Sequence, residues 1–248
     1  MMDNIDIKRV QHRLLEMAKT TAGILDNHNI PYIIAFGTLL GAVRHKGFIP
    51  WDDDFDFFLF DDTYSDGMEC LAKELPSDMF LENDQTEPNY FHAWAHVKDM
   101  NTICECDLYP HDEYYAHKGM NVDLYKMTKI KDKDFADFRY TEAKRYIDRR
   151  MELGFISEED YKRRNQLYLK RRELEENDSE KYVMAYTTDI GKWKYDDVFP
   201  IRKFIFENCE FWGPNNAESI LQDRYGDWRS LPPEEERKPH HSKIVFLK

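Results

Sequence analysis

The chain has 248 residues, of which 42% are hydrophobic, 33% charged and 15% aromatic. This composition predicts a folded protein with a sizeable core and excludes an intrinsically disordered chain. Its 35 basic and 48 acidic residues give a net charge of −13, which argues against nucleic-acid binding because that requires a positive surface. A small anionic substrate is compatible with this charge, because a few local cations and a metal ion can hold one phosphate group.

The sequence contains no segment that we expect to enter or cross a membrane. The longest apolar stretch, residues 30–43, is interrupted by Pro31, Gly37 and Gly41 and is shorter than the ~20 residues of a spanning helix. The first ten residues lack the apolar core and the cleavage site of a signal peptide. The four cysteines are too few for a disulfide framework, so we expect reduced thiols and a cytoplasmic location.

Periodicity predicts a helix, a strand and a second helix in the first part of the chain. Apolar residues recur near a 3.6-residue period over residues 7–27, and Pro31 prevents that helix from continuing. Residues 32–36 are an apolar run rich in β-forming side chains, which predicts a buried strand that stops at Gly37. Residues 38–44 then read as a turn followed by a helix.

Further strands and helices are expected downstream. Residues 55–60 predict a strand, and residues 61–75 predict a helix with Asp61 or Asp62 as its cap. The segments 91–97 and 102–106 are expected to pair as a hairpin, and residues 121–125 to form a third core strand.

The composition changes along the chain and predicts three parts. Residues 1–128 are expected to form the catalytic core, 129–180 a charged helical arm or insertion, and 181–248 a C-terminal part that packs on the core. The arm is either solvated helix surface or a lid that docks an anionic polymer. The cations of this second alternative are Lys144, Arg145, Arg149 and Arg150.

Acidic residues are concentrated in one short run, at Asp52, Asp53, Asp54 and Asp56. Side chains alternate between the two faces of a strand, so Asp54 and Asp56 point the same way while Phe55 points into the core. Two carboxylates on one face can bind Mg²⁺, which prefers oxygen ligands and leaves positions open for water and phosphate. The alternative is an acidic loop that leads into a strand and binds nothing.

The residues upstream favour the metal-site hypothesis. Phe36, Gly37 and Thr38 end a predicted strand and open a helix, whose first amide groups can bind phosphate. Thr38 adds a hydroxyl group, and Arg44 and Lys46 place positive charge nearby. A glycine-opened helix, cations and paired carboxylates together are typical of a phosphoryl-transfer site.

These motifs resemble those of the LicD family, which includes fukutin and fukutin-related protein within the nucleotidyltransferase superfamily. Residues 37–54 read G-T-L-L-G-A-V-R-H-K-G-F-I-P-W-D-D-D and resemble the family signature almost letter for letter. Asp54 and Asp56 match the superfamily's D-h-[DE]-h pattern, and Asp123 resembles its later acidic residue on a third strand. The resemblance implies an α/β (α+β) nucleotidyltransferase-like fold, in which helices flank a small mixed sheet.

Two other segments are similar to the family. Residues 95–99 resemble its A-K-[VL]-R-D segment, with His96 in place of the usual lysine and Lys98 in place of the usual arginine. Tyr225 opens a match to the closing Y-G-D-x-[WM] pattern, which is followed by His240. His240 is either a site residue or part of a tail without a role.

The resemblance implies an enzyme that transfers a phosphoryl-linked alcohol, such as phosphocholine, from a CDP-activated donor to a glycan hydroxyl and releases CMP. It implies Mg²⁺, with Mn²⁺ as an alternative, held by Asp54, Asp56 and Asp123, and Asp123 can also accept the proton of the acceptor. A glycan or lipid-linked glycan acceptor implies peripheral association with the inner face of the membrane. We expect no nucleic-acid partner.

A wider set of residues is expected to bind substrate: Gly37, Thr38, Arg44, Lys46, Asp52, Lys98 and His240. Asp52 is a reserve metal ligand, whereas Asp53 faces away and is expected to be structural. Four aromatic residues are either a cage for a quaternary ammonium group or core filling: Trp51, Tyr90, Phe91 and Trp94.

Three alternatives stay open. One is nucleotidyl transfer from an NTP with release of pyrophosphate, and another is a non-catalytic nucleotide- or glycan-binding module of the same fold. The third concerns a cluster that is either a zinc site or a set of partly buried thiols and surface histidines. Its residues are His92, His96, Cys104 and Cys106.

Overall fold

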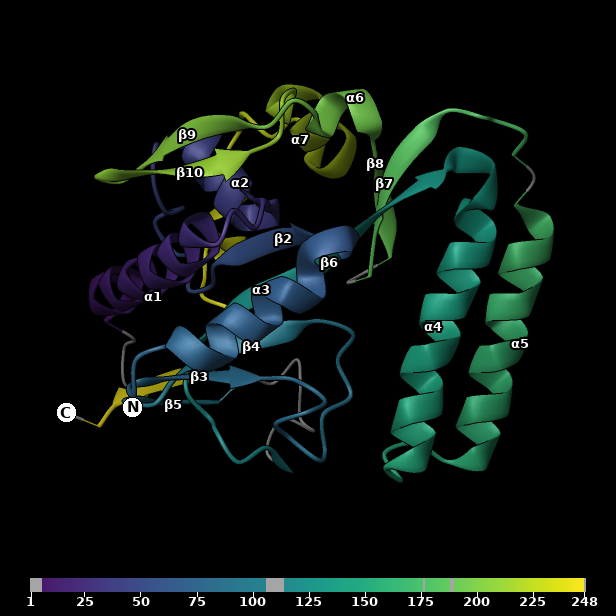
Figure 1. Cartoon of the computed structure of the whole chain (residues 1–248), viewed down its shortest axis with the longest axis horizontal. Helices are drawn as coiled ribbons and strands as arrows, with labels where there is room; N and C mark the ends of the chain where they lie inside the picture. Colours follow the sequence, from purple (N-terminus) through teal and green to yellow (C-terminus); the bar gives the residue numbers. More distant parts are fainter. Residues whose placement is uncertain (1–5, 106–113, 176, 188–189, 248) are drawn as a thin grey trace.

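The computed structural model describes residues 6–105, 114–175, 177–187 and 190–247 (Figure 1). Its central sheet runs in the order β1-β2-β6-β4-β3, with β7 paired to β6 and β8 paired to β7. The strands β2 and β6 are parallel and the other pairs are antiparallel. The mixed α/β fold predicted from the sequence is therefore confirmed. The strand bounds are β1 Tyr32–Ile34, β2 Asp56–Phe60, β3 Met79–Glu82, β4 Ala95–Asp99, β6 Asn121–Lys131, β7 Tyr182–Tyr186 and β8 Gly191–Lys194.

Two helices, α1 (Ile7–Asn27) and α3 (Asp61–Glu74), contact the sheet on one face. The bounds of α1 confirm the predicted helix to the residue, and its buried face includes Leu14 and Met17. The expected acidic cap of α3 is wrong. Its cap position is Phe60, without a side-chain hydrogen bond, and Asp61 instead pairs with Lys126 at 3.1 Å.

The opposite face of the sheet meets α2 (Phe36–Arg44) and α7 (Ala217–Tyr225) near the ends of β2 and β6. A small sheet of β9 (Arg202–Phe206) and β10 (Cys209–Gly213) packs beside α2. Its buried aromatic rings extend the core, since Phe206 and Phe211 each lie 5.2 Å from the ring of Phe55. The acidic run is thereby fixed between two sheets. The short helix α6 spans Tyr195–Val198 and the 3-10 turn η3 spans Glu234–Glu236.

The predicted hairpin of residues 91–97 and 102–106 is wrong. The strand β4 is already bonded on both edges, to β3 and to β6, so it has no edge left for the next strand. The strand β5 (Thr102–Glu105) pairs instead with β11 (Lys243–Phe246), close to the C-terminus. Residue Cys106 lies outside the described residues.

The charged segment forms a helical hairpin of α4 (Phe135–Glu152) and α5 (Glu158–Leu174), preceded by a 3-10 turn η2 (Asp132–Asp134). Figure 1 shows the two helices side by side, standing off one end of the sheet. The hairpin is inserted between β6 and β7, whose residues Lys131 and Tyr182 are partners in the ladder. The predicted helical character of this segment is confirmed. We call it the helical arm.

The four cations proposed to hold a polymer are engaged within the protein. Lys144 bonds to Asp148 at 2.6 Å, and Arg145 pairs with Glu142. Arg149 donates to the backbone carbonyls of Tyr90 and Pro88, and Arg150 lies 5.6 Å from the ring of Phe91. These four side chains therefore hold the arm together and attach it to the core. No helix in the described part of the chain is long and apolar enough to span a bilayer.

Candidate active site

The register of two parallel strands brings distant acidic residues together. Asp56 of β2 is the ladder partner of Asp123 of β6, and the Asp123 amide donates to the Phe55 carbonyl at 2.8 Å. Partners in a parallel ladder point their side chains to the same face of the sheet. The two carboxylates are therefore neighbours, as the metal-site hypothesis requires.

The loop before β2 adds two more carboxylates. Ligand atoms of Asp52, Asp54 and His240 all lie within 4.8 Å of one another, and His240 Nδ1 is 3.0 Å from Asp54 Oδ2. A Cβ atom built on Gly37 would lie 3.2 Å from Asp52 Oδ2, so the glycine allows this carboxylate to approach the start of α2. We call Asp52, Asp54, Asp56 and Asp123 the carboxylate cluster. His240, which was weighed as a tail residue, reaches the cluster.

Burial and mutual repulsion dominate the electrostatics of this cluster. They raise the pKa of Asp52 and Asp56 well above the usual range, and they raise the pKa of Asp123 to about 7, with Asp54 as the main charged neighbour. A hydrogen bond to Asp54 raises the pKa of His240 to about 9. Without a cation, the cluster therefore retains protons at neutral pH.

A divalent cation fits the groups that are present. The Asp54 Oδ1 atom is buried and has no hydrogen-bond partner among the described residues, which is costly for a carboxylate unless a cation neutralises it. Carboxylate oxygens suit Mg²⁺, and the His240 nitrogen also suits Mn²⁺. The expected ligands were Asp54, Asp56 and Asp123, whereas the compact ligand set in the structure is Asp52, Asp54 and His240.

The Thr38 side chain has a different hydrogen-bond partner from the phosphate that the sequence predicted. Its side chain is buried, and its Oγ1 accepts a hydrogen bond from the Asp56 amide at 2.9 Å. The hydroxyl group thus fixes the backbone at the start of β2, whereas the sequence predicted that it would bind phosphate. Gly37 lies at the first turn of α2, whose amides have no partner within the helix.

Of the expected cations, Arg44 has other hydrogen-bond partners and Lys46 has an exposed side chain. Arg44 donates to the carbonyls of Trp228 and Ser230, so it ties α2 to the chain after α7. Lys46 is exposed, and its carbonyl accepts from the Glu207 amide in the turn between β9 and β10. The expectation that Arg44 and Lys46 offset phosphate charge finds no support in these contacts.

Lys98 and Arg224 are two cations beside the cluster. Lys98 is buried and bonds to Asn121 Oδ1 at 3.1 Å, and its charge lowers the pKa of Asp123. Arg224 of α7 lies 4.1 Å from the ring of Phe36, and its charge lowers the pKa of Asp56. The sequence analysis missed Arg224, although it directly precedes the Tyr225 that opens the closing motif.

A row of polar side chains crosses the sheet at the level of the cluster. The ladder partners in this row are Glu82 with His96, His96 with Asp123, and Asp123 with Asp56. His96 Nδ1 lies 3.1 Å from Glu82 Oε2, and Tyr125 donates to Asp123 Oδ2 at 3.0 Å. The sequence analysis missed Glu82 and Tyr125. The acidic end of the otherwise apolar strand M-F-L-E was the signal for Glu82.

Asp53 faces away from the cluster and anchors the C-terminal segment, which agrees with the structural role expected for it. It is 1% exposed and accepts hydrogen bonds from the amides of His240 and His241 at 2.8 and 3.0 Å. The His241 ring is a third partner. This anchor holds His240 beside Asp54.

The structure has different consequences for the hypothesis of an ammonium cage and for that of a cluster of histidines and thiols. Tyr90 and Phe91 are buried together with Tyr115, so the four-residue ammonium cage does not form. His92 and His96 are buried too, so the prediction that they are surface residues is wrong. Cys104 is half-buried, as that alternative expected.

The site combines a mixed sheet, carboxylates from two parallel strands and a helix with a glycine in its first turn. Residues 29–141 match the family model of the LicD/FKTN/FKRP nucleotidyltransferase domain, the family that the motifs in this part of the chain predicted. The chain is 25% identical to the lipopolysaccharide cholinephosphotransferase LicD of Haemophilus influenzae, over 269 aligned residues that cover 99% of this chain and 100% of the relative.

Two other relatives are more similar over a shorter length. An uncharacterized protein of Rickettsia prowazekii is 56% identical over 122 residues, which cover 48% of this chain and 46% of the relative. An uncharacterized protein of Rickettsia typhi is 56% identical over 126 residues, which cover 47% and 40%. Each of these matches spans less than half of the relative.

Proposed function

We propose that this protein is a cholinephosphotransferase that moves phosphocholine from CDP-choline to a glycan hydroxyl and releases CMP. One observation carries the proposal: Asp56 and Asp123 are partners on parallel strands, with Asp52 and Asp54 beside them at the start of α2. The similarity to a lipopolysaccharide cholinephosphotransferase supports phosphocholine as the group transferred. A lipid-linked acceptor would place the reaction at the inner face of the membrane.

The donor diphosphate needs positive charge and hydrogen-bond donors. A Mg²⁺ ion held by Asp52, Asp54 and His240, with Asp56 beside them, would neutralise the charge that develops on the phosphoryl oxygens. The first amides of α2, opened by Gly37, are placed to donate to a phosphate, and Arg224 adds a fixed charge. Together these groups favour departure of CMP.

The acceptor hydroxyl must lose its proton as it attacks phosphorus. Asp123 is suited to take that proton, because burial raises the pKa of its carboxyl group and makes it a stronger base than an exposed carboxylate. Tyr125 and Asn121 donate to its two oxygens at 3.0 and 2.6 Å and orient it. The acceptor oxygen forms the new bond to phosphorus, the bond between phosphorus and CMP breaks, and the proton passes to Asp123.

The test is a mass-spectrometric assay of CMP release by the full chain with CDP-choline, Mg²⁺ and glycan acceptors. We expect acceptor-dependent release of CMP that falls by at least ~10³-fold in Asp56→Asn. The matched control is Asp62→Asn, an exposed carboxylate on α3, which should keep normal activity. Release of pyrophosphate from an NTP, or full activity in Asp56→Asn, would overturn the proposal.

A further inference from the structure

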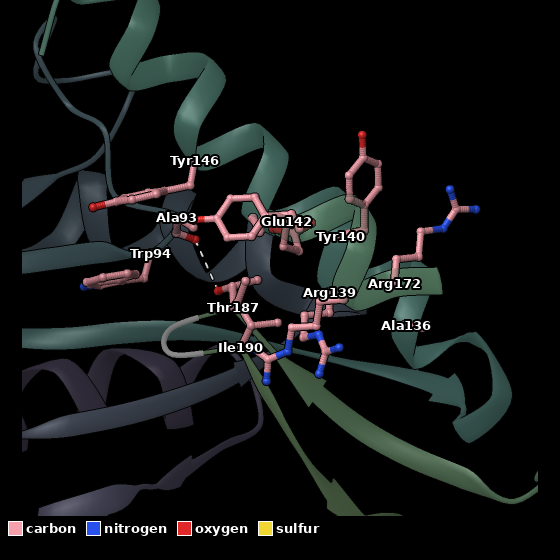
Figure 2. A pocket seen from close by; sticks show the side chains of 13 residues that line it. Ala93, Trp94, Ala136, Arg139, Tyr140, Glu142, Tyr146, Arg172, Thr187 and Ile190 are labelled. Atoms are coloured by element: carbon pink, nitrogen blue, oxygen red, sulfur yellow. Dashed lines mark hydrogen bonds between the residues drawn. The ribbon is translucent and has the colours of Figure 1, made fainter. Parts of the chain in front are cut away.

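A cavity of about 400 Å³ lies between the helical arm and the sheet (Figure 2). Its walls come from α4 and α5, from Ala93 and Trp94 just before β4, and from Thr187 and Ile190 just after β7. The hydrogen bond from Thr187 Oγ1 to the Ala93 carbonyl closes one side. This volume is within the range of small-molecule sites, and the carboxylate cluster is not part of the wall.

The cavity has an aromatic end and an end rich in arginine, and the carboxylate of Glu142 in its wall is paired with Arg145. Figure 2 shows Trp94 and Tyr146 at one end, and Arg139 and Arg172 toward the other. Aromatic rings pack against the C–H faces of sugars, whereas arginine side chains bind phosphate or carboxylate in a fixed planar geometry. The lining therefore fits a sugar that carries an anionic group, and its arginines disfavour a quaternary ammonium group.

The arginines that line the cavity differ in whether they already form an ion pair. Arg139 pairs with Glu175, and Arg172 pairs with Asp137. For Arg171, which also lines the cavity, no ion pair is found among the described residues, and its side chain is exposed. Arg171 is therefore the arginine best placed to receive an anion.

One layer of side chains separates this cavity from the carboxylate cluster. The Trp94 ring lies 5.2 Å from the ring of Tyr125, and the Tyr125 hydroxyl donates to Asp123. Trp94 also donates through Nε1 to His96, at 3.0 Å. A glycan seated in the cavity would thus lie one layer of side chains away from the group that we propose takes the acceptor proton.

We infer that this cavity is the acceptor subsite and binds a sugar unit that carries a phosphate or carboxylate group, with Arg171 as its anion-binding side chain. Its role as an acceptor subsite rests on the proposed function, whereas the binding of an anionic sugar does not. The helical arm then serves to dock the acceptor, through the residues that line this cavity. The four outer cations considered from the sequence have other partners.

The first test measures binding without donor or metal, by ligand-observed NMR titration of the full chain. The probes are glucose 6-phosphate, glucuronic acid, neutral glucose and inorganic phosphate. We expect one or both anionic sugars to bind more tightly than glucose and phosphate, and Arg171→Gln to weaken them by roughly tenfold or more. The adjacent exposed Lys170, which does not line the cavity, supplies the control Lys170→Gln.

A second variant, Ala136→Phe, fills the cavity from α4 without touching a charge. We expect it to abolish binding of the sugars and, in the transfer assay, to raise KM for the acceptor while leaving KM for CDP-choline unchanged. Binding that is equal in Arg171→Gln, Ala136→Phe and the wild type would overturn the inference. Anionic-sugar binding in a protein that does not turn over CDP-choline would support the site and contradict the proposed function instead.

Discussion

Asp123 is subject to two opposing influences. Tyr125 and Asn121 donate hydrogen bonds to its carboxylate, while burial and the charge of Asp54 raise its pKa to about 7. Because the folded-state pKa lies above the unfolded value near 4, the folded state binds more protons between these two pH values. Stability of the metal-free protein should therefore fall as pH rises from about 4 to about 7.

Loss of the Asp123 proton is expected to destabilise the metal-free protein. We therefore predict that Asp123→Asn stabilises the metal-free protein at pH 8 and abolishes transfer. The asparagine removes a buried like charge, and each kcal/mol gained should raise Tm by about 2–4 °C in a chain of this size. Thermal unfolding in EDTA at pH 4 and pH 8 measures the effect, which should be present only at the higher pH. A lower Tm for Asp123→Asn than for the wild type at pH 8 would show that the hydrogen bonds to the Asp123 carboxylate contribute more to stability than its repulsion by Asp54 costs.

Lys98 illustrates a second residue-scale effect, the dependence of one buried charge on another. Its ammonium group is buried 3.7 Å from the fully buried carboxylate of Glu82. We expect Lys98→Met to cost about 3 kcal/mol, because it removes positive charge from beside a buried carboxylate. Chemical denaturation measures this cost, and the double variant Lys98→Met with Glu82→Leu should recover most of it. A double variant as unstable as Lys98→Met would contradict this account.

At the scale of elements, the C-terminal segment is held by one buried carboxylate. Asp53 accepts hydrogen bonds from both backbone amides of His240 and His241, and β11 then pairs with β5. These contacts place His240 next to Asp54 across most of the length of the chain. The site is therefore completed by a segment whose position depends on Asp53 and on the β5–β11 ladder.

We expect Asp53→Ala to release this segment and to leave the central sheet folded. Hydrogen exchange of residues 239–247 should accelerate by at least ~10-fold, since hydrogen bonds to a charged group contribute about 1.5–3 kcal/mol each. Hydrogen exchange followed by mass spectrometry measures this, with β2 and β6 as internal controls. Equal protection of the segment in both proteins would mean that the β5–β11 ladder holds it alone.

At the scale of the whole molecule, the helical arm is an insertion in a β-hairpin. Lys131 and Tyr182 are ladder partners, so a two-residue Asn-Gly turn in place of residues 132–181 should close β6 onto β7. We expect Mg²⁺ to raise the Tm of the full chain, and the shortened protein should show the same rise because the carboxylate cluster is outside the arm. Its overall Tm should be lower, since Phe91 loses contact with Tyr146 and Phe155.

Thermal unfolding with and without Mg²⁺ tests this, together with KM for the acceptor. We expect the acceptor KM to rise while KM for CDP-choline is maintained. A shortened protein that no longer responds to Mg²⁺ would show that the arm is needed to form the site. A shortened protein with an unchanged acceptor KM would count against docking of the acceptor on the arm.

Prediction from sequence succeeded where the relevant forces act between near neighbours in the chain. The 3.6-residue period of α1 and the alternation of Asp54, Phe55 and Asp56 depend on backbone geometry alone. The spacing of the LicD signature likewise lies within a single short segment, and the family was identified from it. Hydrogen-bond partners were predicted less well, because Thr38 and Arg44 satisfy groups that only packing brings close.

The sequence by itself determined the fold class, the first helix and the acidic residues from which a metal site can be built, since these follow from local periodicity and residue chemistry. The tertiary structure alone decided that His240 joins Asp54, that Glu82 completes the polar row, and that β5 pairs with β11. Pairing between remote segments depends on which edges and buried polar groups remain unsatisfied after the core has formed. The order of residues along the chain does not contain that information in a form that local patterns reveal.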